Sequence, residues 1–398
     1  MNKFLNTPLK REILRQLYYQ NIVTCGDLSA LLDKSIPLIG KAVAELLESG
    51  MITTADYAGS TGGRKALQYT IRPNSVFVLA VAMDQLYTTV SVLDISDNNA
   101  VYFKRFSLKL LNNDAALEQL VECIHEILIG SKIPPNKILG IGLGMPGFVN
   151  TKTGYNQSYA FTDNQISVRE YLKDIFKIPV IMDNDSSIIA LGESKFGMAK
   201  GKKDVLVVNI SWGIGLGMLI DGKIFRGNTG YAGELSHIPT AENDILCECG
   251  KKGCLETEAT LRTVAQHAID GMRKGVFSGI QSNKDDSTEE IAYAVMYAAN
   301  RGDQFCIELI SDMAYKIGKA LAILIHIINP EQILLSGRAS EVGKLLIAPI
   351  QQALNKYCIP RLMESVELNV STLKYKAYSI GAAALVIDNL SDVNNVAA

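Results

Sequence analysis

A short segment in the second half of the chain concentrates side chains that can bind a metal ion. Three cysteines, Cys247, Cys249 and Cys254, lie close together, and nine residues separate them from His237. One imidazole and three thiolates complete a tetrahedral shell of the type that zinc prefers, and a closed shell is typical of a structural site. Three thiols crowded among glycines have no other packing role. The spacing therefore predicts one structural zinc in a loop over residues 237–254, rather than free thiols.

The other cysteines form no second cluster. The total of seven is odd, and no apolar leader follows the first residues, so we expect reduced thiols rather than disulfides. The most apolar stretch, residues 320–328, contains His326 and is too short to span a bilayer. We therefore expect a cytoplasmic protein with no membrane partner. The scattered cysteines are Cys25, Cys123, Cys306 and Cys358.

The first 50 residues carry the punctuation of three short helices. Thr7 and Pro8 begin the first helix, a capping box at Thr24 begins the second, and Ser35 caps a third that ends at Gly50. Apolar residues recur at helical spacing within each segment. A short helix, a tight turn and a longer helix form the helix-turn-helix pattern, which places its last helix in the major groove of DNA.

After Gly50 the pattern changes to two strands, residues 51–57 and 69–71, joined by a glycine-rich segment. This predicts a hairpin wing with Arg64 and Lys65 at its tip, where they can contact phosphates or the minor groove. A surface hairpin with incidental charge is the alternative. Because the hairpin follows a three-helix unit, we favour DNA binding.

The predicted recognition helix offers few polar side chains. Ser35 and Lys41 are the obvious polar contacts, whereas Leu38 and Gly40 occupy positions where such helices often carry hydroxyls. Two alternatives remain open. Base recognition is sparse and partly apolar, through thymine methyls, or specificity comes from the wing and from DNA shape.

Charge and periodicity divide the 398 residues into two parts. Residues 1–72 contain nine Lys and Arg against six Asp and Glu, so they carry +3, while the whole chain carries −2. Beyond Pro73, strands alternate with helices, which predicts α/β layers. We expect a DNA-binding domain over residues 1–72 and a ligand-binding domain over residues 73–398.

The cysteine segment resembles the signature of the ROK family, which contains bacterial repressors and sugar kinases. Ser236 replaces a glycine of that signature. The resemblance, to the repressor branch, covers nearly the whole chain. It implies an α/β fold in which a winged helix-turn-helix precedes a two-lobed, actin-like ATPase domain. The matching segments are residues 140–149 (GIGLGMPGFV), 183–185 (DND), 213–217 (GIGLG), 233–237 (GELSH) and 247–256 (CECGKKGCLE).

The resemblance also implies a sugar site. The catalytic base of the kinases maps to Asp185, which here would be vestigial and bind a sugar hydroxyl. Carboxylates, an amide and a zinc-polarised imidazole are suitable partners for the hydroxyls of a pyranose. His237 would give one ring nitrogen to zinc and the other to the sugar. The sugar-binding positions are Asn184, Asp185, Glu234, His237 and Glu256.

The nucleotide half departs from the kinase pattern at three places. The first phosphate loop, Asp-x-Gly-Gly-Thr in the kinases, reads AMDQL at residues 82–86. Trp212 stands where the second loop has a threonine, and the glycines of the adenosine side are reduced to SGRA at residues 336–339. Phosphoryl transfer depends on positioning by such loops, so we expect neither ATP nor Mg²⁺ as a cofactor.

The sequence thus predicts a sugar-responsive transcriptional regulator, a repressor, that has lost kinase activity. Its partners would be a double-stranded DNA operator and a sugar or sugar-phosphate effector, and the family implies a homodimer or homotetramer. Two alternatives remain. One is an active sugar kinase with an accessory DNA-binding domain. The other is a scaffold that binds a transport-system protein instead of a sugar.

Overall fold

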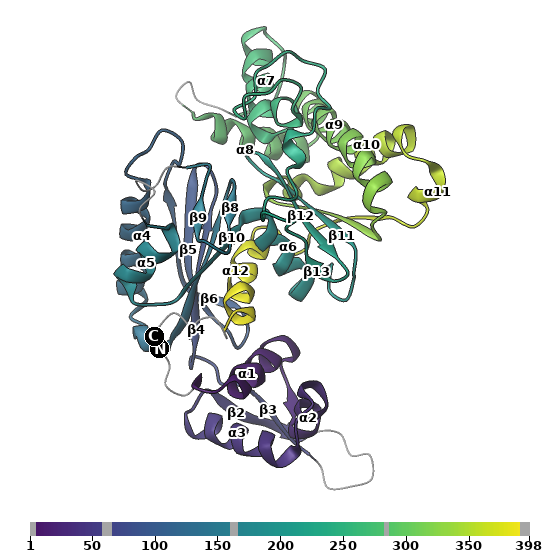
Figure 1. The fold of residues 1–398 in the computed structure, drawn as a ribbon. Coiled ribbons are helices and arrows are strands. Elements are labelled where there is room, and N and C mark those ends of the chain that lie inside the picture. The colour runs from purple at the N-terminus through teal and green to yellow at the C-terminus, as the bar shows by residue number, and fades with distance from the viewer. Residues whose placement is uncertain (1–4, 58–65, 160–165, 282–285, 391–398) are drawn as a thin grey trace. The chain divides into compact units, whose positions relative to one another are not determined.

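The computed structural model describes residues 5–57, 66–159, 166–281 and 286–390. The chain forms two compact units, Met1–Asn184 with Ser379–Ala398, and Asp185–Tyr378. Each unit contains one five-stranded sheet, and the first also contains a small N-terminal group of three helices (Figure 1). No helix in the described ranges is long and apolar enough to cross a membrane.

The N-terminal elements form a winged helix-turn-helix, as the sequence predicts. Three helices pack with a three-stranded antiparallel sheet of order β1-β3-β2. Asp33 takes a left-handed conformation, with φ 51°, in the turn before the third helix. The elements are α1 (Pro8–Gln20), β1 (Val23–Thr24), α2 (Cys25–Leu32), α3 (Ile36–Glu48), β2 (Ile52–Tyr57) and β3 (Leu67–Ile71).

Helix caps fix where these helices begin. The hydroxyl of Thr7 accepts a hydrogen bond from the backbone of Lys10, and Thr24 and Asp27 form the reciprocal capping box. Ser35 occupies the N-cap position of α3, but its side chain makes no capping hydrogen bond, which corrects its predicted role as a side-chain cap. Pro37 in the first turn of α3 has its φ preset for a helix.

The sheet of the first unit has the order β10-β7-β4-β5-β6. Strands β4, β5 and β6 are antiparallel neighbours, whereas β7 is parallel to β4 and β10 is parallel to β7. A two-stranded ribbon, β8 with β9, lies outside this sheet. The strands are β4 (Phe77–Met83), β5 (Tyr87–Asp94), β6 (Asn99–Ser107), β7 (Ile138–Met145), β8 (Val149–Asn150), β9 (Tyr155–Asn156) and β10 (Val180–Asn184).

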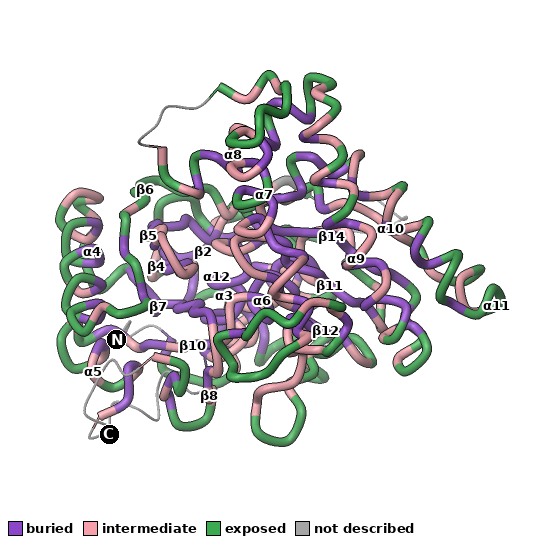
Figure 2. Tube along the Cα trace, turned by 90° about the horizontal axis from the view of Figure 1, so that it is seen from above, coloured by how far each residue is buried: buried purple, intermediate pink, exposed green. Residues whose placement is uncertain are grey.

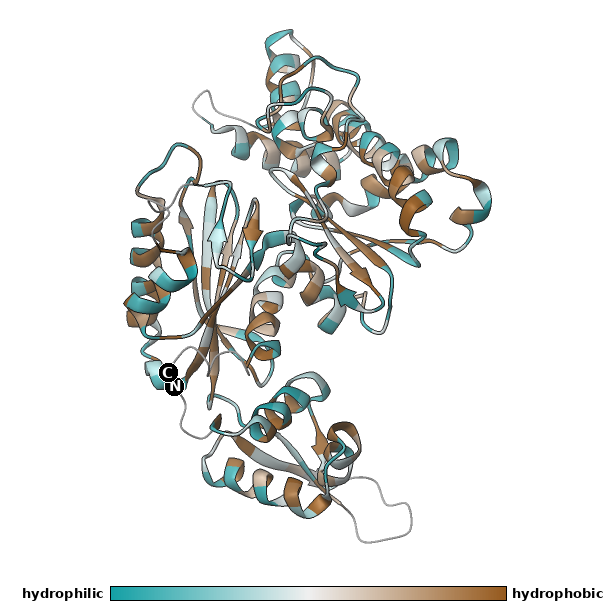
Figure 3. Ribbon diagram, viewed as in Figure 1, coloured by the Kyte–Doolittle hydropathy of each residue, from teal (hydrophilic) through white to brown (hydrophobic). Residues whose placement is uncertain are grey.

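Helices cover both faces of this sheet. Buried side chains of α4 (Ala116–Ser131) and α5 (Val168–Phe176) share one core with the sheet. On the other face, α12 (Lys376–Asp388) approaches β7 so closely that a Cβ on Gly142 would lie 2.1 Å from the carbonyl oxygen of Ala382. Glycine at this position is therefore a packing requirement. The core strands are buried and apolar (Figures 2 and 3).

The second unit repeats the same sheet topology. Its order is β13-β12-β11-β14-β15, with three antiparallel strands followed by two parallel ones. Two such sheets in one chain are the architecture that the sequence predicts for an actin-like domain. The strands are β11 (Val205–Ile210), β12 (Ile214–Ile220), β13 (Lys223–Ile224), β14 (Gln332–Ser336) and β15 (Glu367–Val370).

Helix α6 (Asp185–Phe196) packs on one face of this sheet, where a Cβ on Gly217 would lie 2.4 Å from that of Ala190. A larger helical core covers the other face. Its first helix begins after the capping box formed by Thr260 and Thr263. The remaining helices are α7 (Leu261–Arg273), α8 (Thr288–Asn300), α9 (Gln304–Ile328), α10 (Gly343–Tyr357) and α11 (Pro360–Met363).

Candidate metal and ligand site

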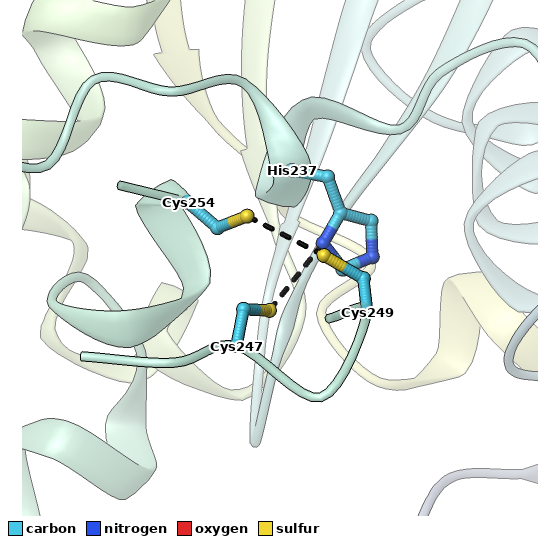
Figure 4. Close-up of side chains that lie close together, drawn as sticks. All are labelled: His237, Cys247, Cys249 and Cys254. Atoms are coloured by element: carbon cyan, nitrogen blue, oxygen red, sulfur yellow. Dashed lines mark hydrogen bonds between the residues drawn. The ribbon is translucent and has the colours of Figure 1, made fainter. Parts of the chain in front are cut away.

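The predicted metal ligands come together in the second unit. One donor atom from each of the four residues lies within 4.8 Å of every other (Figure 4). The Sγ atoms of Cys249 and Cys254 are 3.5 Å apart, and Sγ of Cys247 is 3.7 Å from Nδ1 of His237. Two thiolates at about 2.3 Å from a tetrahedral zinc are separated by about 3.8 Å. The donor set and its spacing therefore fit a zinc ion, with His237 binding through Nδ1.

Backbone turns shape this loop around the donors. The amide of Cys247 donates to the carbonyl of Lys251 over 2.8 Å, and Gly250 donates back to Cys247 over 2.9 Å. Gly250 and Gly253 have φ of 82° and 81°, a conformation that glycine adopts without strain. A bridge between Pro239 and Cys254 joins the two ends of the loop. The glycines between the cysteines thus serve the turn that brings the sulfurs together.

The second ring nitrogen of His237 faces the predicted sugar-binding carboxylates. Its Nε2 lies 3.9 Å from an Oε2 of Glu234. Burial lowers the pKa of His237, which favours the neutral ring that a metal requires. The two ring nitrogens therefore lie toward different groups, Nδ1 toward Cys247 and Nε2 toward Glu234, and the sharing of this ring between zinc and a sugar stays a prediction.

Three carboxylates gather beside this histidine. Burial, followed by the charges of Asp185 and Glu256, raises the pKa of Glu234 to about 7. Burial also raises the pKa of Glu256 to about 7, against a hydrogen bond from the amide of Ile214. Like charges in a partly dry site disfavour ionisation. Such a group is suited to accepting and donating hydrogen bonds with hydroxyls.

Asp185 is the first residue of α6, where the positive end of the helix dipole favours a carboxylate. Its Oδ1 accepts a hydrogen bond from the amide of Ser186 over 2.7 Å, and Oδ2 accepts one from Nδ2 of Asn209 over 3.3 Å. Asn209 is not among the residues that the sequence predicts for this site. The available signal was an amide inside the otherwise apolar strand β11.

Asn184 is the one predicted sugar-binding residue that belongs to the first unit. It ends β10, and its Nδ2 donates to the carbonyl oxygen of Gly147 over 3.1 Å. The structure brings Asp185, Glu234 and Glu256 together with His237 within the second unit.

The first phosphate-loop position is a closed hairpin turn between β4 and β5. Oδ1 of Asp84 accepts hydrogen bonds from the amides of Leu86 and Tyr87, each over 2.8 Å. The amide of Asp84 itself donates to the carbonyl of Tyr87 over 2.9 Å. These three amides are thus paired inside the turn, whereas a phosphate cradle needs amides directed toward its ligand.

Polar groups at the second and third phosphate-loop positions are also hydrogen-bonded to other groups of the protein. The hydroxyl of Ser211 donates to Oδ1 of Asn209 over 2.9 Å and accepts from the amide of Arg338 over 3.2 Å. The guanidinium of Arg338 forms an ion pair with Glu289 and a hydrogen bond with Tyr293. Trp212 packs against the helical core of the second unit.

The predicted DNA contacts divide between described and undescribed residues. Ser35, Leu38 and Lys41 are all exposed at the beginning of α3. Arg64 and Lys65 lie outside the described residues, so their contact with DNA stays a prediction.

Comparisons with known proteins agree with this architecture. The ROK family model matches residues 105–389. A glucokinase of Halalkalibacterium halodurans is 34% identical over 67% of this chain and 82% of its own length. A xylose repressor of Caldicellulosiruptor bescii is 27% identical over 95% of each chain. A crystal structure of a ROK family transcriptional regulator, a homolog of the E. coli MLC protein, has a TM-score of 0.77 at 23% identity, covering 98% of both chains. The family model spans most of the chain and the fold agrees with it, so this chain belongs to the ROK family.

Proposed function

We propose that this protein is a sugar-responsive, DNA-binding transcriptional regulator, and specifically a repressor, that acts in the cytoplasm. Residues 1–72 form the DNA-binding domain and residues 73–398 the sensor. The observation that carries this proposal is a winged helix-turn-helix with an exposed α3 in the same chain as a ROK domain. The xylose repressor, which matches along 95% of both chains, supports it.

The effector in this proposal is a sugar or sugar phosphate. Asp185, Glu234 and Glu256 supply hydrogen-bond acceptors, and Nε2 of His237 supplies a fourth polar group beside them. By family resemblance, Asn184 of the first unit is also a proposed sugar-binding residue. A structural zinc on His237, Cys247, Cys249 and Cys254 holds the histidine ring in place.

The second candidate is an active sugar kinase, and the glucokinase relative favours it. The phosphate-loop positions argue against it. The amides of Leu86 and Tyr87 are bonded to Asp84, and Arg338 is paired with Glu289. Positioning of phosphates by free amides and a metal supplies nearly all of the catalysis in this chemistry. We therefore propose that Asp185 binds a hydroxyl without activating it for attack.

A combined ligand and activity screen tests the proposal. Thermal shift with hexoses, amino sugars and their phosphates should identify a ligand that raises the melting temperature. The same ligand should change the affinity for operator DNA and should produce no sugar-dependent ATP turnover in a coupled assay. Hexose phosphorylation at ordinary enzyme rates would instead establish the kinase. A two-fold symmetric operator would agree with a homodimer or homotetramer.

A further inference from the structure

Helix α3 presents aliphatic side chains to solvent at its N-terminal end. Ile36 is 59% exposed and Leu38 is 46% exposed, and both lie in the first turn of α3. Another face of this helix is packed against the domain. The buried side holds Ile39 and Val43. These buried residues already form the apolar stripe by which α3 packs against the domain, and the two exposed side chains are not part of that stripe.

Gly40 lies on the same helix, one turn from Ile36. A Cβ added to Gly40 would meet nothing within 4 Å, and its backbone is not in the left-handed region. Glycine inside a helix is less stable than alanine, because it loses more backbone entropy on folding. Neither packing nor backbone conformation within the described chain requires glycine here. Close approach of another molecule to the backbone of α3 would give glycine a role at this position.

The charges around this surface indicate what that molecule is. Lys34 and Lys41 are exposed at either side of Leu38, and the sequence between Asp33 and Glu45 contains no acidic residue. Glu45 forms an ion pair with Lys10, 2.5 Å apart. Exposed aliphatic side chains close to exposed lysines are complementary to an anionic groove with apolar groups on its floor. The C5 methyl of thymine is the apolar group on base edges of the DNA major groove.

We propose that Ile36 and Leu38 contact thymine methyl groups in the major groove, and that Gly40 lets the helix backbone approach the bases. Lys34 and Lys41 contact the flanking phosphates. The proposal rests on the proposed DNA-binding function and adds how α3 recognises the base sequence of the DNA. Recognition by α3 is then dominated by thymine methyls rather than by hydrogen bonds to base edges.

The test begins with the full-length protein and a pool of random-sequence duplexes. Repeated selection should enrich a motif with thymines at fixed positions in each half-site. Replacing a contacted thymine by deoxyuridine removes only the methyl group, and each such change should weaken binding about fourfold, the effect of one buried methylene-sized group. Failure to enrich any motif would overturn both the inference and the proposed function. An enriched motif whose thymine and deoxyuridine duplexes bind equally would overturn the inference alone.

Two variants locate the effect on α3. Leu38→Ser should remove at least one of the positions sensitive to deoxyuridine, while Ile129→Ser, which changes a more exposed aliphatic residue of α4, should leave the pattern unchanged. Gly40→Ala should raise the melting temperature and weaken DNA binding on the order of tenfold, because the added methyl crowds the interface. Unchanged affinity in Gly40→Ala would contradict the close approach.

Discussion

His237 connects two kinds of chemistry through one imidazole ring. Nδ1 lies 3.7 Å from Sγ of Cys247, and Nε2 lies 3.9 Å from the carboxylate of Glu234. A ring held by a metal at one nitrogen has a fixed tautomer and a fixed direction at the other. The proposed zinc would therefore affect binding of the proposed sugar without contacting it.

Cys249→Ser tests this connection. Loss of one thiolate should remove stoichiometric zinc and, because His237 loses its anchor, weaken binding of the sugar ligand by about tenfold or more. Elemental analysis of freshly purified protein and calorimetric titration measure the two effects. Cys25→Ser changes a cysteine of α2 outside the cluster and should keep both zinc and ligand affinity. Wild-type protein without stoichiometric metal would contradict the zinc assignment.

Asp185→Asn tests the role of the carboxylate at the beginning of α6. The amide replaces one acceptor by a donor, so a ligand hydroxyl loses its partner, at a cost of about 1 to 3 kcal/mol in binding free energy. Calorimetry with the identified ligand measures the loss. Asp221→Asn, in the exposed turn before β13, is the matched control. Abolition of a measurable hexose phosphorylation by Asp185→Asn would instead assign the residue as a catalytic base.

Among the elements, α1 forms hydrogen bonds with α12, and two of them are accepted by the carboxylate of Asp388. Asp388 Oδ1 accepts from Nε of Arg15 over 3.0 Å and from the hydroxyl of Tyr19 over 2.9 Å. Removing both bonds in Asp388→Ala should lower the free energy of local unfolding of α1 by about 1 to 2 kcal/mol. Faster amide hydrogen exchange in α1 would show it.

The control for Asp388→Ala is Glu12→Ala. Glu12 contacts the same guanidinium, 3.3 Å away, but within α1 and at an exposed position. Such a pair contributes about 0.5 kcal/mol or less, so exchange in α1 should hardly change. Equal effects of the two variants would show that the contact with α12 does not stabilise α1.

Helix α6 contains a buried carboxyl group whose protonation should affect stability. Glu193 is fully buried and bonds to the hydroxyl of Ser371 and to the amide of Met198. Burial raises the pKa of Glu193 above its ordinary value. The folded state then binds a proton more tightly than the unfolded state. The stability that the protonated carboxyl contributes is therefore fully present below pH 4.5 and is lost as the pH rises through the folded-state pKa.

Glu193→Gln should therefore change the free energy of unfolding, relative to wild type, more favourably at pH 8 than at pH 5. The amide is neutral at both pH values and can keep both hydrogen bonds. Denaturant titrations at the two pH values measure the difference. A larger loss of stability in Glu193→Gln at pH 8 than at pH 5 would show that the ionised form is the stabilising one.

At the scale of the whole molecule, the proposed function requires coupling between ligand and DNA. If the sugar changes operator affinity by some factor, DNA must change sugar affinity by the same factor, because the two binding free energies are linked. Couplings of this kind are about 5- to 150-fold. Anisotropy titrations of operator with and without sugar, and calorimetry of sugar with and without operator, should give matching factors. Tight binding of both ligands with no coupling would make the sugar something other than the effector.

The sequence by itself determined the elements and residues whose signals are local. Capping at Thr7 and Thr24 identified the first two helices, and the alternation of strands with helices beyond Pro73 predicted the α/β layers. The metal cluster followed from cysteine spacing, because a short loop brings ligands together whatever the surrounding fold. Strand β6 gives a weaker signal because, as an exposed edge strand, it shows almost no buried face.

Family resemblance implied that some distant residues share a site, but only the tertiary structure shows how they meet. Asp185, Glu234 and Glu256 lie far apart in sequence and gather because β11 and β12 pair while α6 packs on their sheet. The capture of the Leu86 and Tyr87 amides by Asp84 depends on how one turn closes. Likewise, the open space beside Gly40 is a property of the packed helix unit. Periodicity reports which face of an element is buried, whereas contacts across elements depend on packing of the whole chain.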